Sequence, residues 1–148
     1  MQVRDIMTSS PVCVEPNTSL EAVAQMMVEC DCGAVPVCDQ ENNVVGIVTD
    51  RDIVCRTLAK GLDALEMIAR DALTPNPRTI TQEASVDDCI LLMERYRVRR
   101  IPVTDEQERL IGMVSQADIA TRAVAEQPDM VDEFEEALEE ISQPKLAI

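Results

Sequence analysis

Gly-Ile-Val-Thr-Asp-Arg-Asp-Ile at residues 46–53 is echoed by Gly-Met-Val-Ser-Gln-Ala-Asp-Ile at residues 112–119. The two stretches are 66 residues apart, and sliding the chain over itself by that distance aligns residues 3–60 with residues 69–126 without a gap. A fixed internal period of this length is the sequence signature of a structure built from repeated units. The recurring stretch therefore predicts a duplicated fold.

The two copies keep residues with special backbone requirements in step. Proline, glycine and aspartate recur at equivalent positions, which chance similarity over 58 positions would not produce. The identities include Arg4/Arg70, Asp5/Asp71, Thr8/Thr74, Pro11/Pro77, Ser19/Ser85, Met27/Met93, Pro36/Pro102, Val37/Val103, Asp39/Asp105, Gly46/Gly112, Val48/Val114, Asp52/Asp118, Ile53/Ile119 and Arg56/Arg122.

Within each copy, the spacing of apolar residues predicts the order β-α-β-β-α. Leu20, Val23, Ala24 and Met27 recur at helical spacing, and Ser19 is placed to cap that helix. β-branched residues that follow polar turns indicate strands. The expected strands are residues 12–14, 34–37, 44–49, 78–80, 100–103 and 110–115, and the expected helices start near Thr18 and Ala84 and span residues 50–59, 62–70 and 116–125.

This order of elements resembles the CBS domain and its tandem form, the Bateman module, especially in stand-alone prokaryotic CBS-pair proteins. Three features carry the resemblance in each copy. They are the opening Arg-Asp-Ile-Met-Thr at residues 4–8 with Ala-Arg-Asp-Ala-Leu-Thr at residues 69–74, the Pro-Val strands at 35–37 and 101–103, and the stretches at 46–53 and 112–119. Each feature is modest alone, and together, twice and at matched spacing, they are specific.

The resemblance implies an α/β (α+β) fold in which two β-α-β-β-α CBS repeats pack with pseudo-twofold symmetry. We expect CBS repeat 1 at residues 1–61, a linker and CBS repeat 2 at residues 62–126, and an acidic amphipathic helix and tail at residues 127–148. A copy of about 60 residues would be marginally stable alone, and pairing lets two copies share a core.

The same resemblance implies a non-catalytic regulatory module. It would sense an adenosine-type ligand (AMP, ADP, ATP or S-adenosylmethionine) in the cleft between the repeats, and it would act as a homodimer without a required cofactor. The sequence has no histidine, no G-x-S-x-G motif and no P-loop, which argues against an enzyme. The alternative is a ligand-free homodimeric scaffold that uses its acidic C-terminal helix to recruit an unknown protein partner.

The resemblance also suggests which residues would meet the ligand. Thr and Pro near the start of one copy would approach it, and a family pocket often combines them with the aspartate of the other copy. Apolar side chains would enclose the base. The expected ligand-binding residues are Thr8, Pro11, Val14, Ala34, Val35, Thr49, Asp52, Thr74, Pro77, Ile80, Arg99, Arg100, Ile101, Ser115 and Asp118.

The polar and the apolar residues of this set can also be explained by structural roles alone. Thr49 and Ser115 can be helix N-caps whose capping boxes are completed by Asp52 and Asp118, instead of ribose ligands. The apolar candidates can be ordinary core. Both interpretations stay open at this point.

Arg95, Arg97, Arg99 and Arg100 form the only dense basic cluster. A nucleotide phosphate bound by an acidic protein would need such compensation, and the family resemblance favours Arg99 and Arg100. The alternative is that these arginines pair with nearby acids, including those of the C-terminal segment. Copy one lacks this charge, because Cys32, Gly33 and Ala34 stand at the matching positions. We therefore expect unequal sites.

Charge and hydropathy limit the kinds of binding partner and the cellular location that we expect. The net charge is −15, which repels nucleic acids and anionic membranes, so no partner of either kind is expected. No apolar run approaches the ~20 residues that span a bilayer, and the start has no signal-peptide pattern. A cytoplasmic location is expected. Aromatic residues are limited to Tyr96 and Phe134, so the core should be aliphatic.

Six cysteines are compatible with several states. Reduced thiols are expected in the cytosol, and the absence of histidine and of CxxC argues against zinc, although a Cys-only site from distant strands stays open. No metal ligands are predicted. A bridge between Cys13 and Cys38 is geometrically conceivable in this fold.

Residues 126–140 carry eight acids and no base. Val131, Phe134, Leu138 and Ile141 nevertheless form one apolar stripe at helical spacing, and Pro128 suits a helix start. We expect this helix to pack on the module or on a second subunit.

Overall fold

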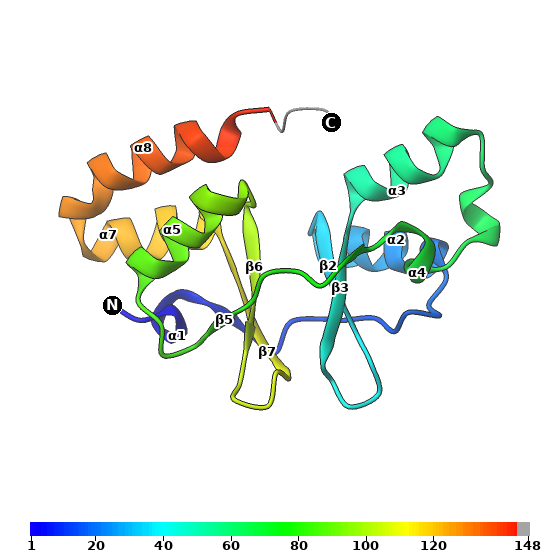
Figure 1. The fold of residues 1–148 in the computed structure, drawn as a ribbon, viewed down its shortest axis with the longest axis horizontal. Helices are drawn as coiled ribbons and strands as arrows, with labels where there is room; N and C mark the ends of the chain where they lie inside the picture. The colour runs from blue at the N-terminus through cyan, green and yellow to red at the C-terminus, as the bar shows by residue number, and fades with distance from the viewer. Residues whose placement is uncertain (145–148) are drawn as a thin grey trace. The chain divides into compact units, whose positions relative to one another are not determined.

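A computed structural model describes residues 1–144 and shows a mixed α/β chain in two compact units (Figure 1). Unit 1 consists of Met1–Pro11, Arg78–Glu106 and the chain from Ile111 onward, and unit 2 consists of Val12–Pro77 and Gln107–Leu110. Each unit therefore takes its opening segment from the other sequence repeat. The predicted fold class is confirmed.

Unit 2 is built on a three-stranded antiparallel sheet in the order β2-β3-β4. Strand β2 pairs with β3 from Ala34↔Thr49 to Cys38↔Val44, and β3 pairs in turn with the short β4. The elements of unit 2 are α2 (Leu20–Glu29), β2 (Ala34–Cys38), β3 (Val44–Thr49), α3 (Asp50–Arg56), the 3-10 turns η1 (Leu58–Lys60) and η2 (Ala64–Glu66), α4 (Ala69–Ala72) and β4 (Thr74–Pro75).

Unit 1 is built on a four-stranded sheet in the order β1-β7-β6-β5, in which β1 is antiparallel to β7 and β5 is parallel to β6. Its elements are α1 (Val3–Ile6), β1 (Thr8–Ser9), β5 (Ile80–Thr81), α5 (Val86–Tyr96), β6 (Arg100–Thr104), β7 (Leu110–Ser115), α6 (Gln116–Asp118), the π-helical turn η3 (Ile119–Ala123), α7 (Val124–Glu126), the 3-10 turn η4 (Pro128–Met130) and α8 (Val131–Ser142).

An arginine holds the exchanged opening segment in each unit. In unit 2, Arg56 Nη1 donates hydrogen bonds to the carbonyl oxygens of Ala72 and Leu73, both at 2.7 Å. In unit 1, the equivalent Arg122 Nη1 donates to the carbonyl oxygen of Ile6 at 2.6 Å and to that of Met7 at 3.2 Å. These carbonyls end the short helices α4 and α1, so each guanidinium satisfies acceptors that the helix cannot satisfy itself.

Glycine allows the opening segment to lie close against the sheet. A Cβ added to Gly46 would stand 2.9 Å from Leu73 Cδ1 and 3.1 Å from the Thr74 carbonyl oxygen. In the other unit, a Cβ on Gly112 would stand 2.6 Å from Met7 Sδ. The glycines that recur at these two positions are therefore explained by close backbone approach.

The long helices begin where the sequence predicts. Ser19 accepts a hydrogen bond from the amide of Ala22 at 3.1 Å, and Ser85 accepts one from the amide of Asp88 at 3.0 Å. Both serines are confirmed as N-caps. Strands β3 and β7 also have the predicted bounds.

Other elements differ from the prediction. The strand expected at residues 12–14 is reduced to a single bridge between Val14 and Val37, and Ala24 is exposed rather than buried. Strands β1 and β4 were not predicted, because a two-residue strand that pairs with a distant partner has no local pattern. The helix expected at residues 116–125 contains a π-helical turn.

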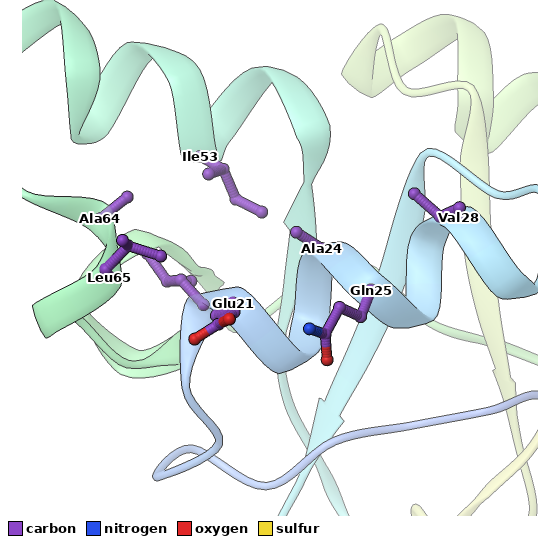
Figure 2. A pocket seen from close by; sticks show the side chains of 8 residues that line it. Glu21, Ala24, Gln25, Val28, Ile53, Ala64 and Leu65 are labelled. Atoms are coloured by element: carbon purple, nitrogen blue, oxygen red, sulfur yellow. The ribbon is translucent and has the colours of Figure 1, made fainter.

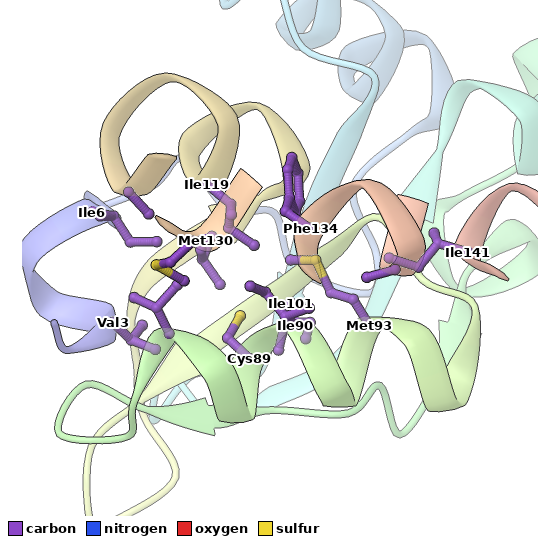
Figure 3. Close-up of a cluster of buried hydrophobic side chains, with 14 of the residues drawn as sticks. Val3, Ile6, Cys89, Ile90, Met93, Ile101, Ile119, Met130, Phe134 and Ile141 are labelled. Carbon is purple, nitrogen blue, oxygen red and sulfur yellow. The ribbon is translucent and has the colours of Figure 1, made fainter. Parts of the chain in front are cut away.

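Two separate hydrophobic clusters form the cores of the units. The cluster of unit 2 is aliphatic and comprises Val14, Leu20, Val23, Met27, Val35, Val37, Val48, Ala69 and Ala72. The cluster of unit 1 includes Ile90 and Met93 of α5 and Ile101 of β6, and Phe134 is its one aromatic residue (Figure 3). The expected aliphatic core is thus confirmed with a single aromatic contribution.

The C-terminal helix covers one face of unit 1. Phe134, Ala137 and Ile141 of α8 are buried, and Figure 3 shows Phe134 and Ile141 beside Met93 of α5. Packing on the module, one of the two alternatives from the sequence, is what the structure shows. Within residues 1–144, no helix has the length and apolar character required to cross a membrane.

Replacing Phe134 with alanine should lower the free energy of unfolding by about 3–5 kcal/mol, because it opens a cavity beneath α8. Urea unfolding followed by circular dichroism at fixed protein concentration measures the loss. Glu135→Ala is the matched control on the exposed side of α8 and should change the free energy by less than about 0.5 kcal/mol. Equal effects of the two substitutions would contradict the buried position of Phe134.

Candidate functional site

The predicted ligand residues separate into two sets, one in each unit. The exchange of opening segments joins Thr8 and Pro11 of the first repeat to residues of the second repeat. The set in unit 1 is Thr8, Pro11, Ile80, Arg99, Arg100, Ile101, Ser115 and Asp118. The set in unit 2 is Val14, Ala34, Val35, Thr49, Asp52, Thr74 and Pro77. The combination expected from the family, Thr and Pro of one copy with Asp of the other, is present within each unit.

Short backbone contacts connect the polar members of the unit 1 set. Thr8 of β1 pairs with Met113 of β7, two residues before Ser115. The amide of Gln116 donates a hydrogen bond to the carbonyl oxygen of Arg99 at 3.1 Å. The start of β6 and the end of β7 therefore lie together, with the exposed Thr8 on the neighbouring strand.

Both aspartates complete capping boxes. In unit 2, Thr49 Oγ1 accepts a hydrogen bond from the amide of Asp52 at 3.0 Å, and Asp52 Oδ2 accepts one from the amide of Thr49 at 3.0 Å. In unit 1, Asp118 Oδ2 accepts hydrogen bonds from the amide and the hydroxyl of Ser115 at 2.8 and 2.6 Å. The structural alternative is confirmed for both pairs, and ribose binding by them stays a prediction.

The second oxygen of each carboxylate faces the arginine that holds the opening segment. Asp52 Oδ1 lies 3.6 Å from Arg56 Nη2, and Asp118 Oδ1 lies 3.7 Å from Arg122 Nη1. These longer contacts are weaker than the capping bonds. One oxygen of each partly exposed carboxylate therefore keeps capacity to accept a further hydrogen bond.

Most apolar candidates belong to the cores. Val14 and Val35 lie in the core cluster of unit 2, and Ile101 is fully buried in that of unit 1. Ala34 is also buried, whereas Ile80 is partly exposed. The ordinary-core interpretation therefore accounts for Val14, Val35 and Ile101, and contact of these side chains with a base stays a prediction.

Some side chains of the arginine cluster have partners within the chain and others do not. Arg97 pairs with Glu140 of α8 at 2.8 Å, as the alternative of pairing with C-terminal acids predicts, and Arg95 stands over the Tyr96 ring at 5.6 Å. Arg99 and Arg100 are exposed, and their side chains have no hydrogen-bond or ion-pair partner in residues 1–144. The two arginines singled out from the sequence are thus the ones left available.

A third donor lies beside these arginines. Gln116 Nε2 is buried and has no hydrogen-bond partner among the described residues. A buried amide donor without a partner costs free energy, and an acceptor brought by a ligand would satisfy it. Sequence reasoning missed Gln116. The only available signal was its position next to Ser115 in the repeat.

Unit 2 has the opposite charge at the equivalent positions. Gly33, Ala34 and Asp50 replace Arg99, Arg100 and Gln116. The Asp50 carboxylate covers Gly33, since a Cβ on that glycine would stand 3.2 Å from Asp50 Oδ2. The unit 2 set therefore presents a carboxylate where the unit 1 set presents guanidinium groups.

A family model, described as CBS domain, matches this chain twice, at residues 3–56 and 69–125. The chain belongs to the CBS domain family. Hypoxic response protein 1 of Mycobacterium tuberculosis is 41% identical to it over 117 residues, which cover 79% of this chain and 81% of that protein. The predicted family membership is confirmed by the two matches.

Solved CBS pairs share the fold. The crystal structure of Hypoxic Response Protein I with two coordinated zinc ions is 39% identical, covers 82% of this chain and 98% of that chain, and has a TM-score of 0.75. The CBS domain pair of protein MJ0100, in complex with 5′-methylthioadenosine and S-adenosyl-L-methionine, is 26% identical, covers 81% of this chain and 97% of that chain, and has a TM-score of 0.73.

The residues of this CBS pair do not fit a zinc site of the usual kind. The chain has no histidine, and within residues 1–144 no three of its cysteine, aspartate or glutamate residues lie close enough together to hold a metal ion.

Two thiols of this CBS pair are strongly shielded. Burial raises the pKa of Cys38 to about 12, with further contributions from the adjacent Cys13 thiol and the Asp39 carboxylate. Burial alone raises the pKa of Cys89 to about 12. Cys13 and Cys38 are neighbours, because the Cys38 amide donates to the Val14 carbonyl oxygen at 2.8 Å and the two thiols hydrogen-bond. Both are free thiols here.

Alkylation with iodoacetamide at pH 8 should label Cys13, Cys30 and Cys55 quickly, because they are exposed. Cys38 and Cys89 should react more slowly by a factor of at least roughly 100. The thiolate is the reactive form, and a raised pKa lowers its fraction at pH 8. Mass-spectrometric peptide mapping over time measures each rate. Six thiols titratable after non-reducing denaturation would rule out a Cys13–Cys38 bridge. Labelling of Cys38 as fast as Cys55 would contradict its burial.

Proposed function

We propose that this CBS pair is a non-catalytic, cytoplasmic regulatory module that binds an adenosine-type ligand and acts as a homodimer. AMP, ADP, ATP and S-adenosylmethionine are the candidate ligands, and no cofactor is required. The observation that supports ligand binding most directly is the set of unpartnered donors in unit 1, namely Arg99, Arg100 and Gln116 Nε2. The binding residues come from both sequence repeats, because unit 1 includes the opening segment of the first.

The charge of the donor set favours a phosphate. Arginine binds phosphate through several N–H groups in a fixed geometry, and two adjacent arginines would compensate the negative field of a chain with net charge −15. Ser115 precedes Gln116 in the chain, and Asp118 follows it by two residues. The Ser115 hydroxyl and the Asp118 oxygen with remaining acceptor capacity would accept hydrogen bonds from the hydroxyls of a ribose. An adenine nucleotide fits this order of groups.

The unit 2 set should bind a different ligand or none. Its Asp50 carboxylate would repel a phosphate at the position that Arg99 and Gln116 occupy in unit 1. A neutral adenosine or the cationic S-adenosylmethionine would not meet that repulsion. The complex of the MJ0100 pair with 5′-methylthioadenosine and S-adenosyl-L-methionine supports adenosine compounds as a ligand class for this fold.

Saturating adenine nucleotide should raise the melting temperature. At a concentration 100 times the dissociation constant, a ligand specific for the folded state adds about 2.7 kcal/mol, or roughly 5–10 °C for a chain of this size. Differential scanning fluorimetry with AMP, ADP, ATP and S-adenosylmethionine tests this at fixed protein concentration. Absence of a shift with all four at millimolar concentration would contradict ligand sensing and favour the scaffold alternative.

Arg100→Ala and Asp118→Ala should each abolish the shift produced by AMP, ADP or ATP. Asp118→Ala should also lower the melting temperature of the unliganded protein, because it removes a capping box worth ~1 kcal/mol. Arg95→Ala is the matched control, because it removes the same charge from the same cluster but lies over Tyr96. Loss of the shift in Asp52→Ala alone would place the site in unit 2.

The scaffold alternative has one observation in its favour. The outward side of α8 is acidic while its inner side is buried, so the helix presents a charged surface without disturbing the core. The exposed acids on it are Asp132, Glu133, Glu135, Glu136 and Glu139. A basic protein partner would bind this surface in the absence of any nucleotide.

A further inference from the structure

The backbone of Gln116 is fixed between the end of β7 and the start of β6. Its amide donates a hydrogen bond to the carbonyl oxygen of Arg99 at 3.1 Å. The residues around it form a capping box, in which the Ser115 amide donates to Asp118 Oδ2 at 2.8 Å and the Asp118 amide donates to Ser115 Oγ at 3.2 Å. The side chain of Gln116 therefore starts from a rigid position, and little freedom of the backbone is lost when a ligand binds to it.

This side chain carries a donor that the folded chain does not use. Gln116 Nε2 is buried from solvent and has no hydrogen-bond partner among the described residues. Most buried amide groups in proteins are paired, and one that is not lowers the stability of the protein. The stability of the unliganded fold therefore gives no reason for a glutamine at this position.

The duplicated fold shows that the position can be filled in another way. Asp50 is the equivalent residue in unit 2, and its amide donates to the carbonyl oxygen of Gly33 at 3.1 Å. The Asp50 carboxylate has a partner, because Oδ1 accepts a hydrogen bond from the amide of Arg51 at 2.8 Å. One backbone position thus carries a paired anionic acceptor in unit 2 and an unpaired neutral donor in unit 1.

The same comparison indicates where the Gln116 side chain leaves the backbone. Asp50 lies over Gly33, since a Cβ on that glycine would stand 3.2 Å from Asp50 Oδ2. Gly33 is equivalent to Arg99, so the equivalent backbone geometry starts the Gln116 side chain on the side of Arg99. Two guanidinium groups without partners, those of Arg99 and Arg100, and an amide donor attract the same kind of group, an anionic oxygen.

We infer that Gln116 makes the unit 1 site selective for phosphorylated ligands, because Nε2 donates to a phosphate oxygen that Arg99 and Arg100 also bind. The inference rests on the proposed function and narrows the ligands of unit 1 to AMP, ADP and ATP. Adenosine and S-adenosylmethionine have the same nucleoside without a phosphate and would leave Nε2 unpaired. A site built to hydrogen-bond one polar group discriminates strongly against an analogue that lacks it, for that reason.

A groove in unit 2 lacks this chemistry. It has a volume of about 300 Å³ and lies on the helical face whose counterpart in unit 1 is covered by α8 (Figure 2). Its almost entirely apolar walls include Ala24 and Val28 of α2, Ile53 of α3 and Leu65 of η2. None of the described residues that line it is cationic, and Glu21 at its edge would repel a phosphate. This groove therefore does not compete with the unit 1 set for a nucleotide phosphate.

Gln116→Met keeps the approximate size of the side chain and removes the donor. The dissociation constants of AMP, ADP and ATP should rise roughly ten- to a hundredfold, because a hydrogen bond to a charged group is lost. That of adenosine should change less than about twofold, since adenosine brings no acceptor for Nε2. Isothermal titration calorimetry measures these constants. The melting temperature of the unliganded variant should equal or exceed that of the wild type, because an unpaired buried donor has been removed.

Two further variants separate the donor from size and charge. Gln116→Glu keeps the length of the side chain but offers only acceptors, so it should weaken AMP binding at least as much as Gln116→Met. Gln127→Met is the matched control, since it makes the same chemical change at an exposed glutamine of unit 1 and should leave all affinities unchanged.

The outcomes distinguish this inference from the proposed function. A wild type that binds AMP, with Gln116→Met or Gln116→Glu binding it equally tightly, would overturn the inference and leave the proposed function standing. The same holds if Gln116→Met weakens AMP and adenosine in equal proportion, or if its unliganded form melts at a lower temperature than the wild type. A wild type that binds none of the adenosine compounds would overturn both.

Discussion

The hydrogen bonds from Arg56 and Arg122 to the opening segments are the contacts on which the architecture depends. Each guanidinium donates to two successive carbonyl oxygens that end a four-residue helix, and that helix has no other means of satisfying them. The helix is then followed by a two-residue strand, β4 or β1, at the edge of the sheet. Such a short strand cannot hold its place by ladder hydrogen bonds alone. The arginine, with a glycine on the neighbouring strand, keeps it there.

This arrangement makes the two sequence repeats mutually dependent. Unit 2 acquires β4 from the start of the second repeat, and unit 1 acquires β1 from the start of the first. Neither repeat contains a complete unit. The exchange also assembles the candidate site, because Thr8 and Pro11 join Arg99, Arg100 and Asp118 only through it. The candidate site and the fold therefore rest on the same contacts, and Asp118, a predicted site residue, is also a capping residue near Arg122.

The sequence was sufficient for the parts of the fold with local patterns. Strands β3 and β7 and the N-caps Ser19 and Ser85 followed from β-branched runs and from serine before an apolar period. The exchange was not predictable in this way, because strand partners far apart in sequence leave no periodicity. Its trace was visible only as identities without an assigned role, Gly46/Gly112 and Arg56/Arg122 among them.

Some residues of the candidate site could be predicted from the sequence, and others could not. Local charge density identified the arginine cluster, and the family resemblance singled out Arg99 and Arg100, whose side chains have no partner in the described chain. Gln116 was missed, because a glutamine gains meaning only when burial removes its hydrogen-bond partners. Val14, Val35 and Ile101 could not be assigned to core or pocket from hydrophobicity, since both environments select the same residues.

The two copies share a fold and differ in the residues that the fold does not constrain. The capping boxes, the arginine contacts and the close glycines are retained in both units, so the constraints of the fold have been kept. Residues free of those constraints differ in charge between the units: the cationic Arg99 corresponds to the neutral Gly33, and the neutral Gln116 corresponds to the anionic Asp50. The covering helix α8 follows the second repeat alone, which seals one helical face and leaves its counterpart bare. The proposed phosphate-binding residues and the uncovered helical face therefore belong to different units of one duplicated scaffold, and a substitution in one need not disturb the other.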